Sequence, residues 1–433
     1  MNRINKLYIQ LSLSLLISTL LCGILASWSF LHPEEYKYAL PFQQLRPFHV
    51  SSAIFWILTG ATTSIFCFTS PQLSKKDQLY ATTFQLIWMI GIALVFISYC
   101  FKQYGGREYW EYPPYINIIF LTGWLFFIKY FSLFWKTIED KKSVYVWMWL
   151  TGTVFFLFTF IEQNLWNFSW FRSSFIKEMT IQWKSNGSMV GAWNQLIYGT
   201  GIYLMVKING NKDIATSKWA YGSYFLGLTN LIFNWGHHIY NLPTAGWVRT
   251  ISYSISMTEW IFVIGIIQNF KVKMIGDEKH HHLLSYRFII ASEAWVFLNL
   301  LLALLMSIPA INRYTHGTHI TVAHAMGTTI GINTMILMAS FAYFTNTETY
   351  SKSTQFVFRL IQTSLFIFWV ALIIAGITKG YLLVEKKVIF SEAFQATVPY
   401  IKAVLFAGII LTSCIIHMVV KYFKNVNYAN NKY

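Results

Sequence analysis

The chain has 433 residues, of which 55% are hydrophobic and 12% are charged, and its formal net charge is +16. A soluble globular domain carries about twice this charged fraction, and apolar residues in long blocks indicate a bilayer. The Lys and Arg residues lie in short loops between these blocks and are not interleaved with aromatics on one face, which argues against a nucleic-acid partner.

Twelve apolar blocks follow one another along the chain, and each is near the length of about 20 residues that spans a bilayer. We predict an all-α integral membrane protein with lipid around it and a single polytopic domain over residues 1–433. No small-residue cleavage site follows the first block, which is predicted to remain as a helix. The blocks lie at residues 7–30, 47–70, 79–101, 114–136, 143–166, 186–206, 217–240, 248–269, 286–308, 318–344, 356–384 and 396–421.

Cationic residues gather in every second loop and at both ends of the chain, for example Lys75, Lys141, Lys212, Lys273 and Lys424. Cytoplasmic loops of membrane proteins carry an excess of Lys and Arg. We therefore expect a bacterial inner-membrane protein with both termini in the cytoplasm.

This orientation places one end of each block at the outer side of the membrane. Histidines lie near such ends in three blocks: His49, His237, His238, His316, His319 and His324. A single buried histidine is most simply a hydrogen-bonded core residue. An ionisable side chain inside a span is nevertheless a functional hypothesis by default, and several at a common depth favour metal binding.

His324 and Met326 are two residues apart, so on one helix their side chains point about 200° apart. One helix can therefore ligate two hemes, with His49 reaching the second heme from across. His237 and His238 diverge by about 100° on a helix, and both are predicted to turn toward a non-heme metal. Two alternatives stay open for Met326. It is a packing residue beside a heme that has another ligand, or the second heme is absent.

Four segments carry a resemblance to a known family: LRPFHVSSAIFWILTG, KQYGGREYWEYPP, GHHIYNLPTAGW and YTHGTHITVAHAMG. In this order, between about residues 40 and 345, they resemble the large catalytic subunit of bacterial nitric oxide reductases in the heme-copper oxidase superfamily. The resemblance implies a twelve-helix bundle like subunit I of that superfamily. It also implies two b-type hemes, a non-heme iron or copper, and a structural calcium ion.

By this resemblance His49 is a ligand of the low-spin heme and His324 is the proximal ligand of the high-spin heme. His237 and His238 match two of the three histidine ligands of the non-heme iron. None of the four cysteines belongs to a CxxCH motif, so a covalently attached heme is not expected.

The resemblance also assigns residues around these centres. Arg107 and Glu108 match residues near the heme propionates and the calcium, and Gly60 matches a backbone calcium ligand. Glu259 matches a carboxylate that the family associates with proton delivery. The alternatives are a surface ion pair for Arg107 and Glu108, and a protonated core carboxyl for Glu259.

The chain departs from the family in the sixth block, where NGSMVGAWN stands in place of HLWVEGVWE. Asn186 replaces the third histidine, and Val190 and Asn194 replace two glutamates. In the tenth block Met326 replaces a histidine of the low-spin heme. An amide is a weaker donor than imidazole, and a thioether ligand raises a heme potential.

We predict reduction of NO to nitrous oxide, with electrons from a cytochrome c subunit or from a quinol. The sixth block shows no tyrosine near the active histidines, because Tyr198 lies twelve residues past Asn186, and this argues against a proton-pumping oxygen reductase. Three alternatives stay open. They are dismutation of NO to dinitrogen and oxygen, another terminal oxidase of the superfamily, and a non-catalytic heme-binding NO sensor.

Overall fold

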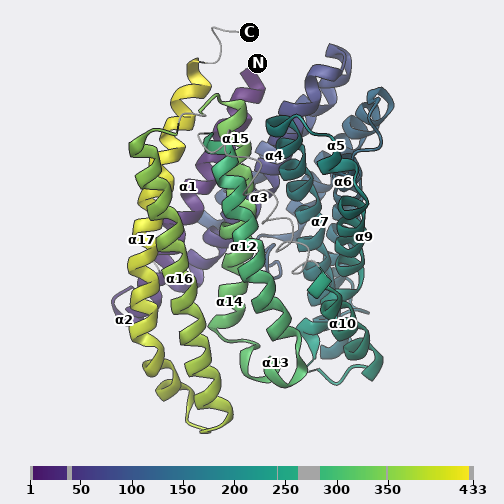
Figure 1. Cartoon of the computed structure of the whole chain (residues 1–433). Helices are drawn as coiled ribbons and strands as arrows, with labels where there is room; N and C mark the ends of the chain where they lie inside the picture. The colour runs from purple at the N-terminus through teal and green to yellow at the C-terminus, as the bar shows by residue number, and fades with distance from the viewer. Residues whose placement is uncertain (1–2, 37–40, 241, 262–282, 348–349, 429–433) are drawn as a thin grey trace.

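A computed structural model describes residues 3–36, 41–240, 242–261, 283–347 and 350–428, mostly as long helices joined by short connections. The predicted all-α class is confirmed. The residues outside these ranges include 262–269 of the predicted eighth block, so its full length is not described. Figure 1 shows a bundle with both termini at one end.

Nine of the described segments are long and apolar enough to cross a membrane. They correspond to nine of the twelve predicted blocks, and the protein is a multi-span membrane protein. The helices in these segments are α1 (Arg3–Leu31), α3 (Phe42–Thr69), α4 (Lys75–Cys100), α5 (Asn117–Thr137), α6 (Val144–Gln163), α12 (Leu284–Ser307), α14 (His319–Met326) continued by α15 (Met335–Phe344), α16 (Lys352–Val384) and α17 (Phe390–Tyr428).

The other three predicted blocks also form helices, with different lengths. The sixth is α7 (Phe175–Asn209), which begins eleven residues earlier than predicted because the Ser174 hydroxyl caps it by accepting from the Lys177 amide. The seventh, α9 (Lys218–Phe233), continues as a 3-10 segment, η4 (Asn234–Ile239). The eighth begins as α10 (Gly246–Thr258).

Shorter helices connect these elements. They are α2 (Pro33–Tyr36), η1 (Ser70–Gln72), η2 (Pro114–Ile116), η3 (Leu165–Asn167), α8 (Asp213–Thr216) and α13 (Pro309–Thr315). A π-helical segment, η6 (Gly327–Thr334), joins α14 to α15. In Figure 1, α2, α10 and α13 lie toward the end of the bundle opposite the termini.

Hydroxyl pairs connect neighbouring helices inside the bundle. Between α1 and α3, Tyr8 bonds Thr62 at 2.9 Å and Ser12 bonds Thr63 at 3.0 Å. Between α15 and α3, the Ser340 hydroxyl donates to Ser64. Lipid tails are as apolar as the helix surfaces, so such bonds and close packing hold membrane helices together.

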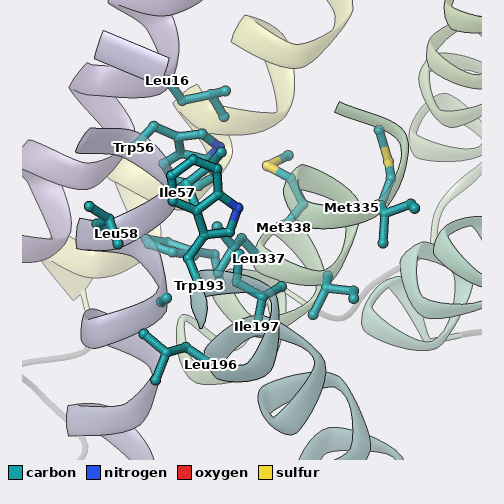
Figure 2. Packing of buried hydrophobic residues seen from close by; sticks show 14 of the residues in the cluster. Leu16, Trp56, Ile57, Leu58, Trp193, Leu196, Ile197, Met335, Leu337 and Met338 are labelled. Atoms are coloured by element: carbon teal, nitrogen blue, oxygen red, sulfur yellow. The ribbon is translucent and has the colours of Figure 1, made fainter. Parts of the chain in front are cut away.

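Part of the apolar core lies where α3, α7 and α15 meet, and Figure 2 shows Trp56 and Trp193 at this junction among Leu196 and Leu337. These four side chains are at most 3% exposed. The Trp56 indole donates at 3.0 Å to the Thr334 hydroxyl at the end of η6. The junction therefore fixes η6, and with it the position of α14.

Two glycines one turn apart let α16 approach the α13–α14 region closely. A Cβ on Gly376 would lie 2.5 Å from the Ile320 amide nitrogen, and one on Gly380 would lie 2.2 Å from the Tyr314 carbonyl oxygen. Small residues spaced four apart allow this backbone contact in membrane helices. The position of α14, which carries His324, depends on these two glycines.

Gly376→Ala is therefore expected to destabilise the protein by about 1–3 kcal/mol, because the added methyl group overpacks the contact with Ile320. Gly222→Ala is the matched control, since a Cβ on Gly222 of α9 meets nothing within 4 Å. Thermal unfolding in detergent measures both variants. Equal melting temperatures for the two would contradict this account of α16.

Candidate metal centre

His237 and His238 lie side by side on η4. Successive side chains of a 3-10 helix diverge by about 120°, yet the two imidazole centroids are only 4.1 Å apart. The His238 ring stacks on the indole of Trp183 from α7, with centroids 5.4 Å apart and an interplanar angle of 13°. Trp183 therefore orients one imidazole of the pair.

Glycines on α7 bring this helix against η4 and the end of α9. A Cβ on Gly187 would lie 3.1 Å from the Trp235 Cβ and 3.5 Å from the His238 Cδ2, and one on Gly191 would lie 2.8 Å from the Leu231 Cγ. The Ser188 hydroxyl adds a hydrogen bond to the Leu231 carbonyl at 3.0 Å. The backbone beside Asn186 is thereby fixed next to His238.

Asn186 is 1% exposed, and neither its Oδ1 nor its Nδ2 has a hydrogen-bond partner among the described residues. Most buried polar groups in proteins are hydrogen-bonded, and an orphaned amide costs free energy, most of all inside a bilayer. A bound ion, water or substrate beside His238 would satisfy it. This amide is the strongest local sign of a ligand.

His324 on α14 completes the group. Its imidazole and that of His316, which follows α13, both interact electrostatically with His238. The Nδ1 atom of His324 is buried and has no hydrogen-bond partner among the described residues. The backbone of Asn299 on α12 interacts with the His324 imidazole. The structure thus brings His237, His238 and His324 together from two distant parts of the chain.

The donor set differs from a closed metal site. Among the described residues, no three His, Cys, Asp or Glu side chains are placed to hold one ion. The imidazoles of His237 and His238 gather here, and the candidate third donor is the amide of Asn186, one residue before Gly187. An amide oxygen is a harder and weaker donor than imidazole, so these residues fit a loosely held metal ion.

His49 lies apart from this group and packs against α1. Its Nδ1 is 2.8 Å from the Thr19 carbonyl oxygen, and a Cβ on Gly23 would lie 2.9 Å from its Cε1. A carbonyl can only accept, so Nδ1 carries the proton and Nε2 keeps its lone pair. Metal-binding histidines typically donate their other ring N–H to such an acceptor, and His49 fits the predicted role of a heme ligand.

Met326, at the end of α14, is half-buried and packs against the apolar core. This contact agrees with the packing alternative, and ligation of a heme by its sulfur stays a prediction. The following segment, η6, packs against α3, which carries His49.

The segment between α4 and η2 forms ion pairs with its neighbours. Arg46 on α3 bonds Glu111 at 2.6 Å and Glu108 at 3.4 Å. Burial raises the pKa of Glu111, and the Arg46 guanidinium opposes that shift. Arg107 pairs with Glu178 at the start of α7 and lies 4.8 Å over the Trp166 ring. These contacts correspond to the ion-pair alternative, although the buried Nε of Arg107 has no hydrogen-bond partner among the described residues.

The structure does not bring Gly60 and Glu108 together as ligands of one calcium ion. Glu108 is held at Arg46, whereas Gly60 lies fourteen residues further along α3, or about 21 Å. The Gly60 carbonyl accepts from the Ser64 hydroxyl at 2.9 Å. A calcium ion at both residues is not compatible with this geometry.

Asn194 and Glu259 lie deeper than the histidines. Asn194 is two turns, about 12 Å, from Asn186 along α7, and its Oδ1 accepts from Asn333 of η6 at 3.0 Å. Glu259, just after α10, interacts electrostatically with Tyr198 of α7. Glu259 therefore lies in the electrostatic neighbourhood of Tyr198, which is twelve residues from Asn186 along α7.

Three contacts of this region have no signal in the sequence. They are the stacking of Trp183 on His238, the pairing of Tyr198 with Glu259 and the approach of Asn299 to His324. Only Trp183 has a hint, because it lies three residues before Asn186 and so on the same helix face.

Comparison with known proteins yields relatives at low identity. Residues 3–410 match the family model described as cytochrome C and quinol oxidase polypeptide I. A nitric oxide reductase subunit of Stutzerimonas stutzeri is 21% identical over 364 residues, which cover 78% of this chain and 74% of that protein. Cytochrome c oxidase subunit 1 of Rhodobacter capsulatus is 24% identical over 352 residues, covering 77% and 64%.

Among solved structures, a heme-copper terminal oxidase dimer determined by cryo-EM superimposes with a TM-score of 0.71 at 11% identity. The match covers 98% of this chain and 84% of the other. This likeness concerns the fold, and it confirms the predicted bundle of the subunit I type.

Gly23→Val is expected to remove the low-spin heme signal, because its side chain would occupy the space of the His49 ring and break the bond to Thr19. Loss of a hydrogen bond that orients a ligating histidine costs about 10–100-fold in affinity. Heme content per polypeptide and the low-spin absorption bands measure the effect. Gly222→Val on α9 is the control, and a low-spin spectrum retained in Gly23→Val would argue against His49 as the ligand.

Proposed function

The chain belongs to the cytochrome c and quinol oxidase polypeptide I family, and from this premise we propose that it is a nitric oxide reductase-like enzyme. It is an oxidoreductase of the heme-copper oxidase superfamily, and the proposed reaction joins two NO molecules to give nitrous oxide and water. The observation that carries the proposal is the group of imidazoles formed by His237, His238 and His324. The orphaned amide of Asn186 precedes Gly187, the residue of α7 that approaches His238.

Each proposed group has residues to hold it. His324 would hold a high-spin heme b, and His49, with Met326 as a second ligand, would hold a low-spin heme b. His237, His238 and Asn186 would hold a non-heme iron or copper. When bound, these groups supply electrons and Lewis-acid stabilisation of negative charge on the substrate.

The residues of the chain position these groups and exclude water. Trp183 stacks on the His238 ring, and Trp193, seven residues past Asn186 on α7, belongs to the apolar core. The free amide of Asn186 offers both a donor and an acceptor to a small polar ligand. Oxygen reduction is disfavoured because the first tyrosine of α7 after Asn186 is Tyr198, about 18 Å along the helix.

Dismutation of NO to dinitrogen and oxygen is the second candidate, favoured by the uncharged side chains at Val190 and Asn194. Reduction of two NO consumes two protons and two electrons, whereas dismutation consumes neither. Asn194 is bonded to Asn333 and cannot carry protons as a carboxylate does. Glu259, with Tyr198, is the carboxyl that a reductase would use instead.

The proposed setting is the bacterial inner membrane, with the termini in the cytoplasm and the hemes near the periplasmic side. Both termini lie at one end of the bundle, and α14, which carries His319 and His324, lies toward the other. The donor would be a cytochrome c subunit or a quinol. A relative that matches 78% of this chain is named as one subunit of nitric oxide reductase, and this supports a multi-subunit complex.

Isotope-labelled NO tests the reaction. Purified protein with a reduced donor is expected to form nitrous oxide at a rate proportional to the donor supplied. His238→Ala and His324→Ala should each lower this rate by on the order of 100-fold, since charge stabilisation at a metal is worth several kcal/mol. His417→Ala on the exposed side of α17 is the control. Dinitrogen and oxygen formed without a donor would favour dismutation, and no turnover by protein that retains both hemes would contradict both reactions.

Asn186→His is expected to raise the occupancy of the non-heme metal, because a third imidazole replaces the weaker amide. Elemental analysis of metal per heme, before and after dialysis against a chelator, measures the change. Asn186→Ala should lose the metal more readily than the native protein. Equal retention by all three proteins would show that residue 186 is not a ligand.

A further inference from the structure

Asn299 of α12 lies against His324 and the first turn of η6. Its Nδ2 donates to the Thr328 hydroxyl at 2.8 Å, and that hydroxyl donates to the His324 carbonyl at 3.2 Å. The backbone of Asn299 interacts with the His324 imidazole. One residue therefore contacts both the ring of His324 and the backbone turn that carries it.

The same side chain fits closely over Gly327. A Cβ at this glycine would lie only 2.2 Å from the Asn299 Oδ1 and 2.6 Å from its Cγ. Asn299 is 2% exposed, and its Oδ1 has no hydrogen-bond partner among the described residues. A buried amide that is packed this closely has a fixed orientation, whereas a surface amide does not.

The backbone around His324 needs such a support. α14 ends at Met326 and a π-helical segment begins at Gly327. π-Helical turns are rare and widen the helix, frequently at functional sites. Thr328 lies in this π-helical turn. Its hydrogen bonds to His324 and Asn299 therefore fix the backbone where α14 changes to η6.

We propose that Asn299 is the positioning residue of His324, holding the imidazole and its turn through Thr328 and Gly327 so that Nε2 faces its ligand. This inference rests on the proposed function, because it takes His324 as a heme ligand. Groups that orient a ligating histidine tune its affinity and its basicity. Asn299 does not touch the substrate and is not a catalytic residue.

The experiment uses the purified full chain with its hemes. Asn299→Ala and Thr328→Val are expected to speed the loss of the high-spin heme to apomyoglobin by about 10–100-fold and to lower the iron–histidine stretching frequency in resonance Raman spectra. Thr328→Ser keeps the hydroxyl and should resemble the native protein. The low-spin heme should be unchanged in all variants.

Asn312→Ala is the matched control, because Asn312 is also buried, donates one hydrogen bond, to the Met306 carbonyl, and has a free Oδ1. A spectrum that changes equally in Asn299→Ala and Asn312→Ala would show a merely structural role. His324→Ala separates the two proposals. If it keeps the high-spin heme, the proposed function fails, whereas if it loses that heme and Asn299→Ala stays native, only the role of Asn299 is overturned.

Discussion

A bilayer offers no hydrogen-bond partner, and the rest of this structure depends on that constraint. Each polar side chain placed inside the bundle must bond another part of the protein or a bound group. The pairs Tyr8–Thr62 and Ser64–Ser340 meet the requirement between helices. Asn186 does not, although it is fully buried. Asn186 precedes Gly187, which approaches His238, and a ligand held at this part of α7 would supply the missing partner.

Close approach of helix backbones is the second condition of the site, and glycine provides it where a side chain would intervene. Gly187 brings α7 to η4, Gly376 brings α16 to α14, and Gly327 admits the amide of Asn299. Each of these contacts places a histidine or the helix that bears it. The glycines therefore connect the packing of the bundle to the geometry of the candidate metal centre.

The sequence predicts the part of this protein that apolar periodicity controls. Spans such as α3 and α12 agree with their predicted blocks to within a few residues, because hydrophobic length is set by the bilayer. The blocks also predict a common depth for His49, His238 and His324, and this stays a prediction. The early start of α7 is not predicted, since it depends on a local cap at Ser174, and neither is the 3-10 form of η4, whose Trp235 packs against Gly187 of α7.

Side-chain partners are harder to predict, because they come from helices distant in sequence. Nothing near Asn299 in the chain indicates that it contacts His324, and the family resemblance placed Gly60 with Glu108, which the length of α3 keeps apart. Motif matching transfers residue identities, whereas a shared ligand requires that two residues lie at the same depth. The rise per residue of α3 separates Gly60 from Arg46, which holds Glu108, and this distance contradicts the calcium assignment.

The substitutions at residues 186, 190 and 194 act together on the electrostatics of one helix face. Histidine and two glutamates in the family pattern become two amides and an aliphatic side chain, so this face of α7 carries no charge. A cation held at the proposed site of His237 and His238 would lack anionic neighbours on this face, which would raise its Lewis acidity and weaken its retention. In the proposed reductase, proton supply would fall to Glu259, which follows α10 and interacts electrostatically with Tyr198. A centre of this kind favours chemistry that needs a strong electrophile and few protons, and this ties the loss of the carboxylates to the choice between NO reduction and NO dismutation.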